Sequence, residues 1–203
     1  KKLKGFRLNT NFGEPQFDVG RAFAFSYGDK ENGAIFSHMC VMFAYALYKR
    51  NFAKEGFAVL NSLYTLAANT PTSKIYPNLP EYFNLEGRGM YSYLTGSASW
   101  YIMTLLTQAF GVHGEYGNLV IEPKLVKEQF KHSKELSVHC SFAGKMLSIR
   151  YLNTKKIDYP HYAIKKVRAP LEFSTFEGRA ILIERKSLVR ASSHIIPITI
   201  ILG

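Results

Sequence analysis

Apolar residues recur every three to four positions through the first half of the chain. This spacing predicts a helix over 34–50 that is buried on most sides, a second helix over 57–69 and a third over 97–110. Gly111 stands where a glycine commonly ends a helix. The prolines and glycines of 70–93 exclude one continuous helix there, and a connection of this length usually carries function.

After Gly117 the apolar period shortens to about two, which is typical of strands. The expected strands are 119–121, 136–142, 146–152, 162–167, 180–184 and 195–202. The sequence therefore predicts an α+β chain with segregated parts: a helical domain over 1–113 and an all-β, sandwich-like domain over 114–203.

Composition indicates an ordinary globular protein, with 47% hydrophobic and 20% charged residues and a dispersed formal charge of +11. A basic balance favours anionic partners, although the chain has no polybasic block. Cys40 and Cys140 fit neither a disulfide framework nor a metal site, which favours a reducing, cytoplasmic compartment. The longest apolar runs are shorter than the ~18–20 residues that span a bilayer. Because the chain starts at Lys1 rather than a methionine, we expect it to be a piece of a longer protein.

Two segments place small or polar residues directly before a helical pattern. Asn32 and Gly33 precede the first helix, which has His38 in its expected first turn, and Thr95 and Gly96 precede the third. The first backbone N–H groups of a helix lack acceptors inside the helix and carry the positive end of its dipole. If the two helix starts converge, His38 and Thr95 would complete an anion site.

Three motifs resemble successive blocks of glycoside hydrolase family 94: N-G-A-I-F-S-H (32–38), Y-L-T-G-S-A-S-W (93–100) and G-V-H-G-E-Y-G-N-L-V-I-E-P (111–123). The family comprises inverting glycoside phosphorylases and the phosphorylase-like region of cyclic β-1,2-glucan synthases. The resemblance covers roughly residues 1–155, and loop 80–91 is more similar to the cyclic-glucan-synthase branch. It implies the closing helices of an (α/α)6 barrel followed by a β-sandwich-like domain.

The resemblance also implies roles for particular residues. His38, Thr95 and Gly96 match the phosphate-binding positions, and Lys30 and Glu31 are candidates for contacting substrate hydroxyls. The family's catalytic aspartate lies upstream in a motif that this chain lacks, as does a phosphate-contacting arginine. No catalytic residue is therefore expected in this chain, and the chain alone should be inactive.

The implied reaction is phosphorolysis of a β-glucan to glucose 1-phosphate. A carboxylic acid protonates the leaving oxygen while the nucleophile attacks the opposite face of the sugar. Phosphate is already nucleophilic, so the chemistry requires no general base, metal or other cofactor, only phosphate as co-substrate. On loop 70–93, Glu81, Tyr91 and Tyr93 are further candidates for substrate contact, with the two tyrosines able to stack on a glucose ring.

Several alternatives stay open. His38 could be a core histidine bonded to a carbonyl, and Thr95 could be a simple N-cap. The chain could instead be a non-catalytic carbohydrate-binding module built on its β-half. A nucleic-acid-binding domain is disfavoured, because aromatic residues do not alternate with lysine and arginine. The expected partners are a β-glucan oligosaccharide, phosphate and the rest of the parent barrel; a homodimer and a place beside the inner membrane, as a soluble region of a membrane protein, are left open.

Overall fold

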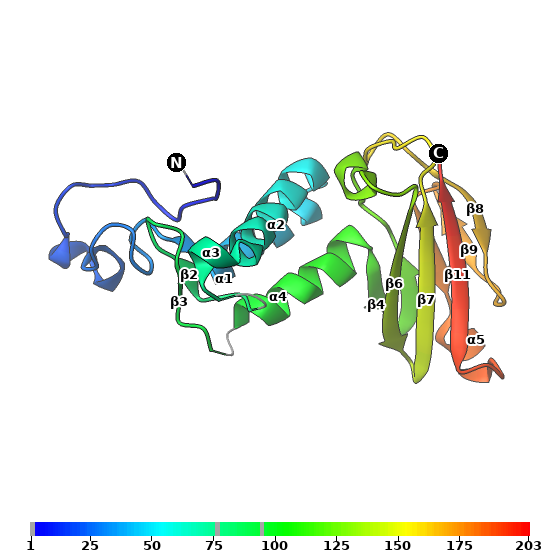
Figure 1. The fold of residues 1–203 in the computed structure, drawn as a ribbon. Coiled ribbons are helices and arrows are strands. Elements are labelled where there is room, and N and C mark those ends of the chain that lie inside the picture. The colour runs from blue at the N-terminus through cyan, green and yellow to red at the C-terminus, as the bar shows by residue number, and fades with distance from the viewer. Residues whose placement is uncertain (1–2, 76–77, 94–95) are drawn as a thin grey trace. The chain divides into compact units, whose positions relative to one another are not determined.

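The computed structural model describes residues 3–75, 78–93 and 96–203 (Figure 1). The chain divides into two compact units, Lys1–Thr104 and Leu105–Gly203, called here the helical unit and the sheet unit. It contains both helices and β-sheets, which confirms the α+β class at this coarse level.

In the helical unit, α1 (Ser37–Lys49) packs against both α2 (Ala53–Ala68) and α4 (Gly96–Thr104). Val41 and Tyr48 of α1 are fully buried, as is Leu63 of α2. Gly56 allows the close approach of the first two helices, since a Cβ there would lie 2.6 Å from Cδ2 of Tyr48. The three predicted helices are therefore present, and the apolar faces of α1 and α2 form the core of this unit.

A small antiparallel sheet has the order β1-β2-β3, with β1 directly before α1 in sequence and β2 and β3 between α2 and α4. Its strands are β1 (Ile35–Phe36), β2 (Tyr82–Phe83) and β3 (Gly89–Met90). The expected helix over 34–50 is wrong at its start, because Ile35 and Phe36 pair with Phe83 and Tyr82 and the helix begins at Ser37. The segment 70–93 holds this hairpin and a single turn of helix, α3 (Thr70–Ser73). Two short 3-10 turns precede the sheet, η1 (Phe17–Val19) and η2 (Arg21–Phe23).

The sheet unit consists of two four-stranded sheets, of order β4-β5-β10-β9 and β6-β7-β11-β8. Their strands are β4 (Val112–Glu115), β5 (Asn118–Ile121), β6 (Glu135–Phe142), β7 (Lys145–Leu152), β8 (Ile164–Arg168), β9 (Ser174–Phe176), β10 (Ala180–Ile183) and β11 (Ile195–Leu202). The pairings are antiparallel except that β11 runs parallel to β7. All six strands expected from the period of two are present, within one or two residues at their ends.

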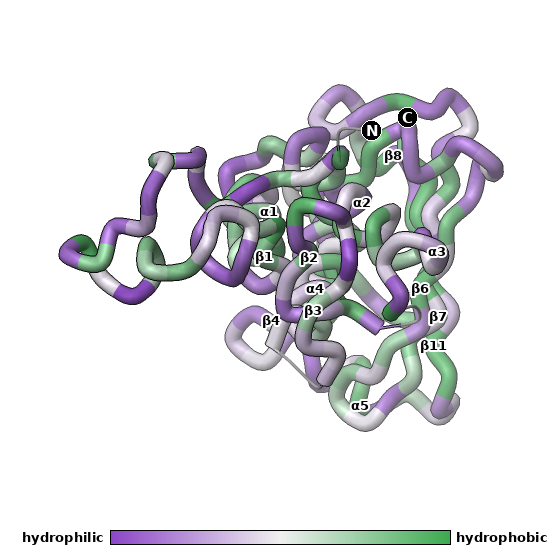
Figure 2. Tube along the Cα trace, turned by 60° about the vertical axis from the view of Figure 1, so that its left-hand side comes forward, coloured by the Kyte–Doolittle hydropathy of each residue, from purple (hydrophilic) through white to green (hydrophobic). Residues whose placement is uncertain are grey.

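Both sheets bury alternate side chains, as a sandwich requires. Ile196, Ile198 and Ile200 of β11 are fully buried, and the strand is hydrophobic along its length (Figure 2). The two buried faces meet: a Cβ on Gly114 of β4 would lie 3.3 Å from the ring of Phe142 in β6. The unit is not purely β, because α5 (Arg185–Arg190) and a 3-10 turn, η4 (Lys127–Phe130), lie between strands.

The division between the units falls at 104/105, whereas the sequence placed it at 113/114. The third helix changes at this point to a π-helical turn, η3 (Leu105–Ala109), which belongs with the sheets. The Tyr151 hydroxyl donates to the carbonyl of Phe110 at 2.7 Å, and the Lys124 amide donates to the carbonyl of Ala109 at 2.9 Å. Gly111 follows with a φ of +72°, which is favourable for glycine after a helix end.

Within the described residues, no helix is both long enough and apolar enough to cross a membrane.

Candidate functional site

The imidazole of His38 lies beside the first residue of α4. His38 is the second residue of α1, and its ring centroid is 5.9 Å from that of Trp100 in α4. A Cβ added to Gly96 would lie 3.2 Å from Cε1 of His38 and 3.6 Å from Nε2. The absence of a side chain at Gly96 therefore lets the start of α4 lie close to the ring.

Two polar atoms in the first turn of α1 lack partners. Among the described residues, neither His38 Nε2 nor Ser37 Oγ has a hydrogen-bond partner, although both atoms are buried. A buried polar group left unsatisfied costs about 1–3 kcal/mol, so such groups usually meet a bound water or ligand. This leaves a ring nitrogen of His38 available beside Gly96.

A short segment before β2 ties the two helix starts together. The amide of Ser37 donates to the carbonyl of Glu81 at 2.8 Å, and the hydroxyl of Ser97 donates to the carbonyl of Pro80 at 3.5 Å. Neither α1 nor α4 has an acidic residue in its first turn. The positive dipole ends of both helices therefore lie close together without a carboxylate of their own to offset them.

The predicted phosphate-binding residues are thus only partly described. The structure brings His38 and Gly96 together, as the converging helix starts required. Thr95 lies outside the described residues.

Four predicted substrate-binding residues form one cluster: Lys30, Glu81, Tyr91 and Tyr93. The Lys30 ammonium lies 3.7 Å from Oε2 of Glu81 and 4.1 Å from the ring centroid of Tyr91. The hydroxyl of Tyr93 donates to the same Glu81 oxygen at 3.3 Å, and the Tyr91 and Tyr93 rings are 5.9 Å apart. Lys30 adopts a φ of +45°, which is uncommon for a residue with a side chain. The cluster offers a cation, a carboxylate and two half-exposed aromatic rings to a ligand.

Glu31 does not join Lys30 in this arrangement. Its Oε1 is 3.3 Å from the guanidinium of Arg21. Oε2 of Glu31 is buried and has no partner among the residues the structure describes. Adjacent residues in a turn point to different sides, which the sequence motif could not reveal.

Asp29 and Tyr82 belong to the same surface and were not predicted as site residues. The Tyr82 hydroxyl donates to Oδ1 of Asp29 at 3.4 Å, and its ring lies 5.9 Å from that of Tyr91. Burial, together with the Asp29 carboxylate, raises the pKa of Tyr82 to about 12. The only sequence signal for a site role was their position: Asp29 directly precedes Lys30, and Tyr82 directly follows Glu81.

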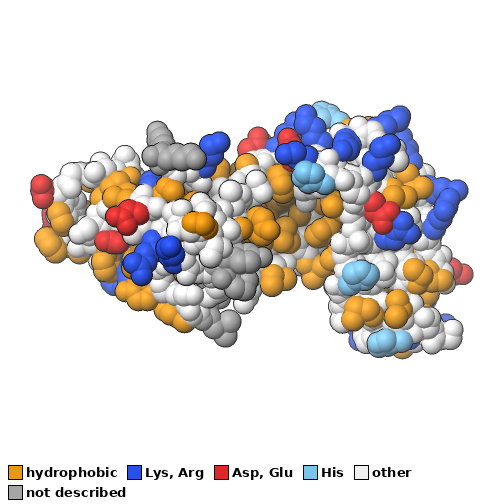
Figure 3. Space-filling model, viewed as in Figure 1, with side chains coloured by type: hydrophobic (Ala, Val, Ile, Leu, Met, Phe, Trp, Pro, Cys, Tyr) orange, Lys and Arg blue, Asp and Glu red, His pale blue; other side chains and the backbone are white. Residues whose placement is uncertain are grey.

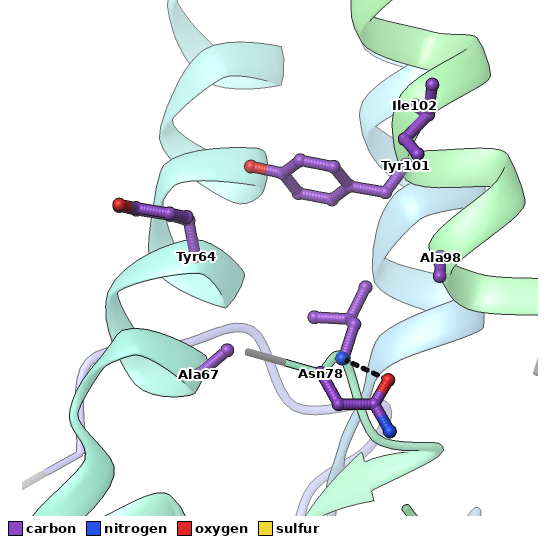
Figure 4. A pocket seen from close by; sticks show the side chains of 7 residues that line it. Tyr64, Ala67, Asn78, Ala98, Tyr101 and Ile102 are labelled. Atoms are coloured by element: carbon purple, nitrogen blue, oxygen red, sulfur yellow. Dashed lines mark hydrogen bonds between the residues drawn. The ribbon is translucent and has the colours of Figure 1, made fainter. Parts of the chain in front are cut away.

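A separate cavity of about 300 Å³ lies in the helical unit between α2 and α4 (Figure 4). Tyr101 points across it from α4, and its hydroxyl donates to the carbonyl of Leu60 in α2 at 3.1 Å. Tyr64 and Ile102 at its rim are more than half exposed. The cavity is open and largely apolar, and it is lined neither by His38 nor by the Lys30 cluster.

The described part of the chain contains no group of three or more His, Cys, Asp or Glu side chains that could hold a metal ion. In comparisons with known proteins, no family model matches the chain and no curated protein shows significant similarity to it.

Proposed function

We propose that this chain forms the phosphate-holding end of the catalytic barrel, and the following β-domain, of an inverting β-glucan phosphorylase. Its proposed reaction is phosphorolysis of a β-glucosidic bond to glucose 1-phosphate, in an enzyme of the cyclic β-1,2-glucan synthase type. This assignment combines the three sequence motifs with the geometry around His38.

The observation that carries the proposal is the unpartnered, buried Nε2 of His38 facing Gly96. A phosphate placed there would meet the imidazole and the backbone N–H groups at the starts of α1 and α4. Helix N-termini bind anions in this way without a metal. Fixing the nucleophile in line with the scissile bond is the main catalytic task left to the protein, and positioning of this kind lowers the barrier substantially.

The cluster around Lys30 is the proposed sugar-contacting surface. Glu81 joins it to the phosphate site, because its carbonyl receives the first amide of α1 while its carboxylate meets Lys30 and Tyr93. Carboxylate and ammonium groups can exchange hydrogen bonds with sugar hydroxyls, and the ring of Tyr91 offers an apolar face. Phosphate and glucan would then lie on two sides of one residue.

The remaining part of the barrel is the proposed packing partner of the helical unit. Met39, Met42 and Phe43 of α1 are each about 40–50% exposed. Ile102 of α4 is 65% exposed beside the cavity between α2 and α4. Exposed apolar side chains gathered on helix faces commonly mark a surface that another element covers, and further barrel helices would supply that cover.

Phosphate titration of the purified chain by isothermal calorimetry tests the phosphate site. We expect saturable binding that is lost in His38→Gln and retained in His161→Gln, a matched substitution of an exposed histidine in the sheet unit. Equal binding by wild type and His38→Gln would refute the site.

Turnover is a separate test. Because the general acid is expected upstream, we expect no glucose 1-phosphate from any β-glucan incubated with this chain and phosphate. Release of glucose 1-phosphate would show that the acid has been assigned to the wrong part of the protein.

A further inference from the structure

The sheet β4-β5-β10-β9 carries a groove on the face that points away from the sandwich core. One hollow of about 400 Å³ lies over β4, β5 and β10, and a second of about 300 Å³ lies over β10 and β9. Leu182 lines both hollows, so they adjoin at this side chain. The register places His113, Val120, Leu182 and Ser174 in one row across all four strands. Three strand spacings make this row about 14 Å long.

The groove has an apolar floor and aromatic ends. Val120, Ala180 and Leu182 form the floor, and Val120 is only 6% exposed although it lies on the outward face. Tyr116, at the turn between β4 and β5, is 96% exposed at one end. Phe173 is 38% exposed at the other end. A single exposed aromatic residue is unremarkable, but here each of the two adjoining hollows has one, which offers a ligand an apolar surface at both ends of the row.

Polar side chains stand along the rim with fixed orientations. The Nδ1 atom of His113 lies 3.0 Å from the carbonyl of Gly111, which leaves Nε2 as the ring nitrogen for a ligand. The side-chain oxygen of Asn118 accepts the amide of Arg185 at 3.0 Å, which leaves the amide NH₂ as a donor. Polar groups held in this way lose little freedom when a ligand binds.

Four glutamates line the two hollows, and two of them pair with a lysine. Glu184 lies 2.6 Å from the ammonium of Lys186, and Glu122 lies 3.8 Å from that of Lys124. Glu184 also raises the pKa of Lys186, which keeps the lysine charged. Elsewhere on the sheet unit, lysine and arginine side chains gather over the upper part of the view in Figure 3. With four glutamates against Lys186 and Lys124, the groove has an excess of negative charge in a basic protein, which disfavours an anionic ligand.

We infer that this groove binds a neutral oligosaccharide. The apolar floor and Tyr116 would contact the C–H faces of successive sugar rings. Glu115, Glu122 and His113 would exchange hydrogen bonds with the hydroxyls. A cationic peptide would also find carboxylates here, so a lysine-rich peptide is the competitor to test. The inference does not rest on the proposed phosphorolysis, because the groove lies wholly in the sheet unit.

Chemical-shift mapping of the ¹⁵N-labelled full chain tests the inference. The probes are short linear β-1,2-, β-1,3- and β-1,4-linked gluco-oligosaccharides, with a lysine-rich peptide as the cationic competitor. We expect at least one glucan to shift the amides of Val120 and Leu182 saturably. Tyr116→Ala should weaken that binding by about tenfold, equivalent to 1.4 kcal/mol. Tyr64→Ala, which removes an exposed tyrosine of the helical unit, should leave it unchanged.

Three results would overturn the inference: no glucan-induced shift on β5 and β10, unchanged binding in Tyr116→Ala, or shifts caused by the lysine peptide and not by glucans. Phosphate titration of the same variants keeps the two proposals apart. If only His38→Gln loses phosphate binding, the result supports the phosphate site of the helical unit and says nothing of the groove. Loss of glucan-induced shifts on β5 and β10 in Tyr116→Ala alone bears on the groove.

Discussion

Gly96→Ala separates binding at the candidate phosphate site from folding. The added Cβ would stand 3.2 Å from Cε1 of His38, closer than carbon atoms normally approach, so the ring must move by a few tenths of an ångström. The same Cβ would occupy part of the space between Nε2 and the start of α4. A phosphate there would lose its contact with the imidazole.

The magnitude follows from the strength of one charge-assisted hydrogen bond. Such a bond contributes about 1.5–3 kcal/mol, so its loss should weaken phosphate binding by roughly 10- to 150-fold. Stability should move little or in the opposite direction, because alanine is favoured over glycine in a helix by up to about 1 kcal/mol. The position has no positive φ that would strain an alanine.

The assay pairs phosphate calorimetry with urea unfolding of Gly96→Ala and wild type. We expect phosphate affinity to fall while the free energy of unfolding stays within about 1 kcal/mol of the wild-type value. Gly203→Ala serves as a control, because its added Cβ has no contact closer than 3.4 Å, it has no positive φ and it lies in the other unit. Undiminished phosphate binding by Gly96→Ala would refute the reasoning.

Three further substitutions or treatments test other parts of the account. Glu81→Gln should weaken β-gluco-oligosaccharide binding, which would be seen as smaller chemical-shift changes at Tyr91. The free energy of unfolding should change by no more than about 1 kcal/mol, because the ion pair between Glu81 and Lys30 is partly exposed. Unchanged shifts would contradict the sugar-contacting role. Tyr151→Phe should lower the free energy of unfolding by about 1–3 kcal/mol in urea titrations, since the carbonyl of Phe110 loses its donor; an unaltered midpoint would contradict this. Burial raises the pKa of Cys40 to about 12, so its thiol should react with a disulfide reagent at pH 8 only after unfolding. The contribution of the buried, protonated thiol to stability should be present below about pH 9 and decline as the pH rises above it. Rapid labelling of native Cys40, resolved by mass spectrometry, would show that the thiol is accessible.

Local periodicity predicts the long elements of this fold well. The buried faces of α1 and α2 repeat at helical spacing, and the six expected strands alternate or are rich in isoleucine, whereas β4 and β9 were not predicted. The prediction that failed, the start of the first helix, depends on contacts between residues far apart in the sequence. Ile35 and Phe36 continue the apolar pattern of α1, yet they pair with residues almost fifty positions later. No local signal distinguishes such a pairing from one more helical turn.

The candidate site shows the same limit. The motifs placed His38 beside Gly96, and Lys30, Glu81, Tyr91 and Tyr93 proved to lie in one cluster. Glu31 instead lies beside Arg21, and Lys30, the residue before it, has a positive φ. Two adjacent residues of one motif thus lie in different surroundings, which the local pattern does not reveal.

The most direct test of the central claim is the ring ¹⁵N shift of His38 during phosphate titration, observed in long-range proton–nitrogen spectra. His38→Gln identifies its signals among those of the six histidines. We predict that phosphate shifts the Nε2 resonance of His38 saturably, while chloride at equal ionic strength does not. A His38 ring indifferent to phosphate, or one that responds equally to both salts, would contradict the account.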